Sequence, residues 1–216
     1  MEYQKYELLK DDAIISFGRT LYRIKATTDF GDVEKGELGG YIEKEENLSH
    51  FGNAWVADNA RVTGNAWVAD NAEVAGNAWV ADNARVTGNA WVADNARVTG
   101  NAWVTDNAWV TGNAEVAGNA RVTGNAWVAG NARVTGNAWV TGNARVTELG
   151  DVIVFENHWS SGGYFTYTKS NKMWKVGCFH GPGEELIAKA YKDSEVSGKH
   201  YESYVNLVLE LEKIDG

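Results

Sequence analysis

A six-residue repeat runs without interruption from Gly52 to Thr147 and constrains the fold more than any other feature of this chain. The sixteen hexads all read Gly or Asp, then Asn, Ala, then Trp, Arg or Glu, then Val, then Ala or Thr. The run from Ala to Val alternates like a β-strand, so Ala and Val point to one side and the variable residue to the other. The Gly/Asp-Asn pair suits a tight bend, because these residues tolerate the left-handed backbone region. Each hexad is therefore predicted to be one short strand and one corner, and stacking of hexads buries the Ala and Val side chains.

The pattern resembles the hexapeptide repeat of left-handed parallel β-helices in the bacterial hexapeptide transferase superfamily, and the resemblance covers residues 52–147. In that superfamily three hexads form one triangular coil, which implies a coil of about 18 residues and about five coils here. With strands about 4.8 Å apart, the β-helix would be roughly 25 Å long. The resemblance predicts a mainly β fold, a left-handed parallel β-helix with Val and Ala layers inside.

The segments that flank the repeat are expected to cap it, because an open coil is a template for aggregation. We expect an N-terminal β-hairpin cap (residues 1–40), a β-helix (41–147) with regular hexads over 52–147, and a small C-terminal α+β domain (148–216). Residues 41–51 are predicted to form an irregular first coil, with Leu48 at the Ala position of the repeat and His50 at the Val position.

Local patterns predict the elements of the two caps. The expected elements are strands 13–17 and 20–26 around the turn Gly18-Arg19, a buried strand 152–155, strands 164–168 and 173–179, and helices from Glu184 to about Lys192 and from about Lys199 to Lys213. Acidic residues in the first turn of the earlier helix suit its dipole. Apolar residues of the later helix fall on one face at helical spacing, which predicts that this face is buried.

The composition limits the classes of partner. The net charge is −9 at pH 7, and neither flank has a basic patch, which argues against nucleic-acid binding. The single cysteine, Cys178, excludes an intrachain disulfide framework and favours a reducing compartment. No apolar run is long enough to span a bilayer, and residues 1–5 do not resemble a signal peptide. We therefore expect a cytoplasmic protein that binds neither nucleic acid nor membrane.

The outward residues form three columns if vertical neighbours are 18 positions apart. The first column reads Trp55, Glu73, Trp91, Trp109, Trp127, Arg145; the second reads Arg61, Trp79, Arg97, Glu115, Arg133; the third reads Trp67, Arg85, Trp103, Arg121, Trp139. The last two columns alternate aromatic and charged residues, which can stack as cation–π pairs. The rhythm slips at Trp103 and Trp109, in successive hexads, and leaves Trp91, Trp109 and Trp127 adjacent. A coil of two hexads would instead stack Trp55 through Trp103 into one aromatic wall.

Three adjacent exposed indoles form a candidate interaction patch, so we predict binding residues at Trp91, Trp109 and Trp127. A second candidate is the polar, Gly-rich and aromatic loop 157–163, with His158 and Trp159 as its binding residues. Proteins of the resembled superfamily commonly trimerise along their faces. We therefore expect self-association into a dimer or trimer, or binding to another protein.

No residue is assigned a catalytic role. Enzymes of the resembled superfamily use a histidine on the β-helix beside a loop that interrupts the coils, whereas residues 52–147 contain neither a histidine nor an insertion. His50 is the one histidine close to the repeat. Cys178 and His180 would share one face of a strand, where a nucleophile pair is conceivable. Metal-ligand spacing and phosphate-binding glycine loops are missing, so we expect no metal and no cofactor.

The leading functional hypothesis is a non-catalytic scaffold or binding protein that acts through the β-helix faces or the C-terminal domain, for example by inhibiting or sequestering a host factor. Residues 157–163 and 174–179 are similar to segments of hexapeptide-repeat proteins from gut bacteria and prophages, which implies a phage or prophage origin. The alternative is a hexapeptide-type acyltransferase with an intersubunit site, which rests on analogy of fold.

Overall fold

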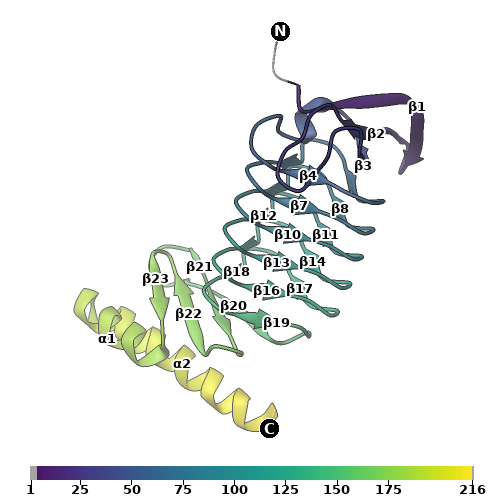
Figure 1. Cartoon of the computed structure of the whole chain (residues 1–216). Helices are drawn as coiled ribbons and strands as arrows, with labels where there is room; N and C mark the ends of the chain where they lie inside the picture. The colour runs from purple at the N-terminus through teal and green to yellow at the C-terminus, as the bar shows by residue number, and fades with distance from the viewer. Residues whose placement is uncertain (1–3, 216) are drawn as a thin grey trace.

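The computed structural model describes residues 4–215 and shows a parallel β-helix with a hairpin at one end and a small sheet with two helices at the other (Figure 1). Residues 1–3 and 216, at the outer ends of the two expected caps, lie outside the described part of the chain. The β-helix makes about six turns, counting the irregular first coil. The predicted mainly β fold with a hairpin before the parallel β-helix and an α+β segment after it is confirmed.

The β-helix has three faces, each a parallel sheet of two-residue strands. Face 1 comprises β4 (Trp55–Val56), β7 (Glu73–Val74), β10 (Trp91–Val92), β13 (Trp109–Val110), β16 (Trp127–Val128) and β19 (Arg145–Val146). Face 2 comprises β5 (Arg61–Val62), β8 (Trp79–Val80), β11 (Arg97–Val98), β14 (Glu115–Val116) and β17 (Arg133–Val134). Face 3 comprises β6 (Trp67–Val68), β9 (Arg85–Val86), β12 (Trp103–Val104), β15 (Arg121–Val122) and β18 (Trp139–Val140).

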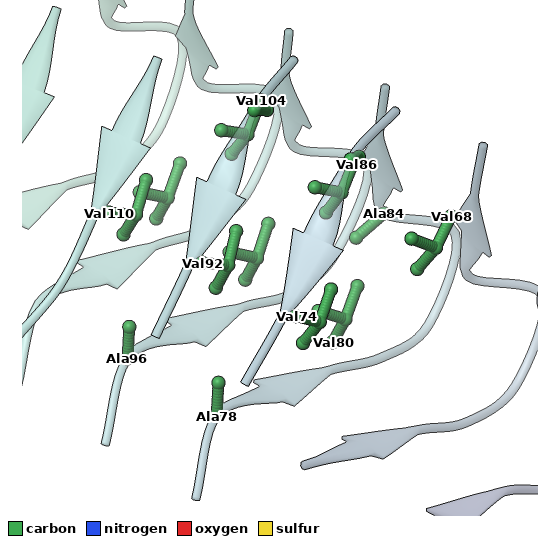
Figure 2. Close-up of a cluster of buried hydrophobic side chains, with 14 of the residues drawn as sticks. Val68, Val74, Ala78, Val80, Ala84, Val86, Val92, Ala96, Val104 and Val110 are labelled. Carbon is green, nitrogen blue, oxygen red and sulfur yellow. The ribbon is translucent and has the colours of Figure 1, made fainter. Parts of the chain in front are cut away.

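The register confirms the coil of three hexads. Trp91 pairs with Trp109, and Val92 pairs with Val110. All three predicted columns are therefore correct, and the coil of two hexads is excluded. The repeat Val and Ala residues point into the β-helix, as Figure 2 shows for four of its coils. Each of these Val residues, and the Ala two positions before it, is at most 1% exposed, so the invariant positions of the repeat make the core.

The corners of the triangle are stacked as regularly as the core. The Gly or Asp of every hexad adopts the left-handed backbone region. At an Asp corner the carboxylate accepts a hydrogen bond from the next coil, as Asp70 Oδ2 does from Gly88 N at 3.0 Å. Asn side chains bond to one another between coils, as Asn83 Nδ2 does to Asn101 Oδ1 at 3.1 Å. These side-chain ladders hold each coil in register with the next.

The N-terminal cap is a hairpin joined to face 2. The hairpin consists of β1 (Tyr6–Ser16) and β2 (Arg19–Ala26), and β3 (Leu38–Ile42) connects β2 to β5. The turn lies at Phe17-Gly18 and not at the predicted Gly18-Arg19. Phe17 has φ +48° and Gly18 has φ +76°, which is the backbone that a two-residue hairpin turn needs.

The predicted alignment of residues 41–51 with the repeat is wrong by two positions. Ile42 and Leu48 each lie beside a repeat Val, and so occupy the Val position of the first coil. Leu48 therefore does not occupy the Ala position, and His50 does not occupy the Val position. The phase changes after Leu48, because Val56 follows it by eight positions, whereas Leu48 follows Ile42 by six. The hexad template anticipates neither these two extra residues nor the 3-10 helix η1 (Glu45–Asn47) that precedes Leu48.

Hydrogen-bond donors close the N-terminal end of the β-helix. The backbone hydrogen bonds between coils run from an N–H group to a carbonyl oxygen of the following coil, as from Trp55 N to Ala72 O. The carbonyl oxygens of the first coil therefore have no preceding coil to bond them. Lys5 Nζ donates to Ala54 O at 2.7 Å, and Asn47 Nδ2 donates to Ala66 O at 2.8 Å. On the remaining face, Tyr41 N of β3 and Glu43 N just after it donate to Ala60 O and Val62 O. The cap thus supplies donors where the fold presents acceptors.

The C-terminal segment is an antiparallel sheet covered by two helices. Its elements are β20 (Val152–Glu156), β21 (Tyr164–Thr168), β22 (Met173–Val176), β23 (Phe179–Gly181), α1 (Gly183–Asp193) and α2 (Glu195–Asp215). The predicted single strand 173–179 is wrong, because Gly177 has φ +53° and turns the chain between β22 and β23. β20 is an edge strand and only half-buried, where a buried strand was expected.

Helix α2 packs on the sheet through the face that its spacing predicted. Tyr201, Val205 and Val208 of α2 are buried with Phe165 and Trp174 of the sheet. Helix α2 begins at Glu195, four residues before the predicted start. Neither helix of the described chain is both long and apolar enough to cross a membrane.

Hydrogen-bond acceptors close the C-terminal end. The last coil presents free backbone N–H groups, the complement of the carbonyls at the other end. Trp139 N donates to Thr166 Oγ1 at 2.9 Å, and Arg145 N donates to Ser170 Oγ at 2.7 Å. The segment after the repeat therefore caps the β-helix directly.

Candidate binding surface

Guanidinium groups lie between the indoles of face 3. Arg85 lies between Trp67 and Trp103, with its guanidinium carbon 5.9 and 5.5 Å from the two ring centroids. Arg121 lies between Trp103 and Trp139 in the same way, at 5.1 and 5.3 Å. The predicted stacking is confirmed on this face, and each exposed pair contributes about 0.5–1 kcal/mol.

Face 2 is covered by the hairpin and by its own charges. The ring of Phe17, at the tip of the hairpin, stacks on Trp79 with centroids 4.7 Å apart and planes inclined by 8°. The guanidinium carbon of Arg97, which follows Trp79 in the column, lies 4.7 Å from the same indole. Arg133 and Glu115 form a salt bridge of 3.1 Å. The single indole of this face therefore has two internal partners.

Face 1 keeps three indoles without a guanidinium between them. We call Trp91, Trp109 and Trp127 the tryptophan row. Trp55, above the row, is 4% exposed and contacts Phe30 edge-on at 5.4 Å. Trp91 and Trp109 also meet edge-to-face, with centroids 4.9 Å apart. Trp109 is 47% exposed and Trp127 is 36% exposed, close to the 40% of Trp67 and 41% of Trp103 on face 3. The row therefore differs from face 3 in that its exposed indoles are adjacent to one another.

A groove of about 410 Å³ lies beside the lower two indoles of the row. Trp109 and Trp127 line it together with Asn107, Asn125 and Arg145. The guanidinium of Arg145 lies 5.4 Å from the Trp127 ring, and Trp127 Nε1 donates to a Thr hydroxyl at 3.2 Å. The side chains that line the groove are thus held by neighbours in the β-helix.

Charges of opposite sign stand at the two ends of the tryptophan row. Glu73 precedes the row and Arg145 follows it. Burial raises the pKa of Glu73, and the negative charges of Asp58 and Asp32 raise it further. The column therefore has a carboxylate at its end near the N-terminal cap and a guanidinium group at its end near the C-terminal cap.

The predicted loop residues His158 and Trp159 belong to a different part of the molecule. Trp159 stacks on His200 of α2 with centroids 4.4 Å apart and contacts Tyr201 edge-on at 5.0 Å. His158 is exposed and lies 5.2 Å from His200, ring to ring. The structure places these two residues against α2 and does not bring them to the tryptophan row.

Sequence reasoning did not find a pocket of about 340 Å³ between α1 and the C-terminal sheet. Phe165, Phe179 and Tyr201 line it with Cys178 and Lys189. These residues come from two strands, a turn and two helices, so no local motif in the sequence connects them. The pocket is apolar in its depth and charged at its margin.

The structure also places the three residues that were considered as nucleophile or base, which are His50, Cys178 and His180. His50 stacks on Tyr6 at 4.3 Å, and its Nδ1 accepts a hydrogen bond from Lys5 N. Cys178 is exposed in the turn between β22 and β23 and not on a strand with His180. Burial lowers the pKa of His180, and the nearby Lys175 lowers it further.

Comparison with known proteins adds no assignment. No model of a protein family matches this sequence. No curated protein matches it either. The surface features of the β-helix itself are therefore the basis for any functional proposal.

Proposed function

We propose that this protein is a non-catalytic scaffold or binding protein that contacts its partner through the tryptophan row on face 1. The observation that carries the proposal is a difference between the faces in which residues lie next to each indole along the column. Faces 2 and 3 place a charged residue next to each indole along the column, whereas face 1 brings Trp91, Trp109 and Trp127 together with no charge between them. A contiguous exposed aromatic patch of this kind is typical of an interaction site.

The β-helix suits such a role because it holds its side chains rigidly. Each strand of face 1 is bonded to the strands before and after it, so the rings are fixed along a regular lattice. Binding then costs little conformational entropy on this side of the interface. Large aromatic side chains in the centre of a patch are also the residues that contribute most to binding energy. The phage or prophage origin and the inhibition of a host factor remain parts of this hypothesis.

A photo-crosslinking residue at position 125 tests the proposal. Asn125 lines the groove beside Trp109 and Trp127, and Asn101, in a corner ladder that does not line this groove, is the matched control. We expect specific cross-linked products from position 125 in native extracts and none from position 101. Equal labelling from both positions would contradict a binding role for the row. Saturable binding of acetyl-CoA, measured by thermal shift, would instead support the acyltransferase alternative.

A further inference from the structure

We propose that a second copy of this chain binds to the tryptophan row, so that two molecules join face 1 to face 1 in an antiparallel pair. This inference rests on the proposed binding role of face 1 and names the partner. In the pair, Trp109 meets its own counterpart, Trp91 meets Trp127 of the second copy, and Glu73 meets Arg145 of the second copy.

The order of residues on face 1 carries this proposal. From the N-terminal to the C-terminal end the column reads acid, three indoles, base, and Trp109 stands at its centre. Read in the opposite direction, the column has the acid and the base exchanged and still has an indole at each of its three middle levels. A two-fold axis perpendicular to the β-helix at the level of Trp109 performs this exchange. Because both copies have the same strand spacing of about 4.8 Å, all contacts along the column fall into register together.

Other symmetric arrangements of face 1 lack this complementarity. If the two copies ran parallel, Glu73 would face Glu73 and Arg145 would face Arg145. A three-fold arrangement about an axis along the β-helix also aligns identical levels and gathers like charges. Like charges opposite each other disfavour a complex, whereas opposite charges also fix its register. The charges of face 1 therefore select the antiparallel pair.

The segments beyond the column extend the same match of charge. Next to Trp55 the loop from Thr27 to Glu37 contains four acidic residues and one lysine. Next to Arg145, at the other end of face 1, the turn 169–172 contains two lysines, of which Lys172 forms a salt bridge of 3.6 Å with Glu212. In the antiparallel pair the acidic loop of each copy lies opposite the basic turn of the other. The interface would then have an aromatic centre and a charged rim, as stable interfaces commonly do.

The shape of the row fits the same register. Trp91 and Trp109 contact each other edge-to-face, whereas a groove lies beside Trp109 and Trp127. Under the antiparallel register the groove of each copy lies opposite the contacting rings of the other copy. One set of rings can therefore fill the hollow that the other set leaves.

Charge reversal provides the experiment. The variants E73R and R145E are made separately and together, and mass and dissociation constant are measured by sedimentation. We expect the natural chain to be a dimer, and each single variant to dissociate on the order of tenfold more readily or worse, because both rim contacts become repulsive. The double variant should dimerise again. A mixture of E73R with R145E should form a mixed dimer, since both of its contacts then join opposite charges.

Three controls separate the proposal from its alternatives. R97E reverses a charge on face 2 and should leave the dimer intact, and circular dichroism verifies that each variant is folded. A monomeric or trimeric natural chain would overturn the antiparallel pair, as would single variants that dimerise normally or a mixture that does not associate. If the chain is monomeric but position 125 still cross-links to another protein, the binding role stands and self-association is refuted.

Discussion

The indole of Trp91 has a buried N–H group without an acceptor among the described residues. Elsewhere an indole N–H donates to a Thr hydroxyl on the preceding coil of the same face, as Trp79 Nε1 does to Thr63 Oγ1 at 3.3 Å. The position equivalent to Thr63 beneath Trp91 is Ala75, which has no hydroxyl. A single missing oxygen therefore leaves the row with an unsatisfied donor.

Substitution of Ala75 by Thr should supply that oxygen. Thr63 is itself buried in the equivalent site, so the larger side chain fits. We expect Ala75→Thr to raise the free energy of unfolding by about 1 kcal/mol, the usual net value of such a bond. Ala93→Thr beneath the exposed Trp109 is the control on the same face and should gain less, because water already reaches that indole. Denaturant unfolding measures both variants, and equal values would contradict the explanation.

Lys5 is a second residue whose surroundings determine its chemistry. Its side chain is fully buried, donates to Ala54 O and Gly52 O, and lies 4.7 Å from the Phe30 ring. Burial lowers its pKa to about 8 from the ordinary 10.5. Between these two values the unfolded chain binds more protons than the folded chain, so the contribution of Lys5 to stability rises with pH. Below pH 8 Lys5 is charged in both the folded and the unfolded chain, so the folded chain bears the full free-energy cost of burying that charge.

The pH dependence is checked by comparing the natural chain with Lys5→Met. We expect the natural chain to gain stability relative to this variant as the pH rises from about 8 toward 10.5. The comparison cancels the opposite contribution of the neighbouring Tyr6, whose raised pKa is common to both proteins. Lys10→Met, at an exposed site on β1, controls for the loss of a lysine. A constant difference across this range would refute the role assigned to burial.

At the scale of the elements, the corners limit how closely coils can stack. A Cβ atom on Gly88 would lie 2.7 Å from Asp106 N, whereas a Cβ atom on Gly136 would meet nothing within 4 Å. Both glycines have positive φ, so replacement by Ala has a similar cost in backbone conformational energy at both sites. The pair therefore isolates the cost of crowding between coils.

We expect Gly88→Ala to destabilise the protein by more than Gly136→Ala. The backbone term is about 1 kcal/mol in each case, and Gly88→Ala adds a shift of the adjacent coil, which raises its total to roughly 1–3 kcal/mol. Thermal unfolding of the two variants measures the difference. If both lose the same stability, the spacing of the coils is more adaptable than the contact implies.

The elements that repeat could be predicted from the sequence, because one template determines the strand, the corner and the coil length together. Elements that depend on contact between distant segments could not. The hexad template gives no sign of the two extra residues between Leu48 and Val56, which place Leu48 at the Val position of the first coil. It also gives no sign that Phe30 and Phe17 cover Trp55 and Trp79. The tryptophan row could be predicted from the columns alone. The role proposed for the charges at its ends could not, because it depends on the strand register and on the caps that lie beside them.

At the scale of the whole molecule, the β-helix is polar, and its two caps have opposite chemistry. The first coil presents carbonyl oxygens, which Lys5 and Asn47 occupy with donors. The last coil presents N–H groups, which Thr166 and Ser170 occupy with acceptors. Without caps, the end of one molecule is the hydrogen-bonding complement of the beginning of another. Head-to-tail growth therefore requires that both caps be absent from the ends that meet.

This asymmetry predicts different outcomes for three truncated chains. Residues 52–147 alone should form filaments, because donors and acceptors of successive molecules pair as coils do within one molecule. A chain of residues 1–150 keeps the N-terminal cap, and a chain of residues 52–216 keeps the C-terminal cap, so each has one blocked end and should not elongate. Mixing these two chains should give head-to-tail dimers and no filament, since each supplies one open end. Electron microscopy and sedimentation distinguish these products. Filaments from either singly capped chain would show that the faces, and not the ends, control assembly.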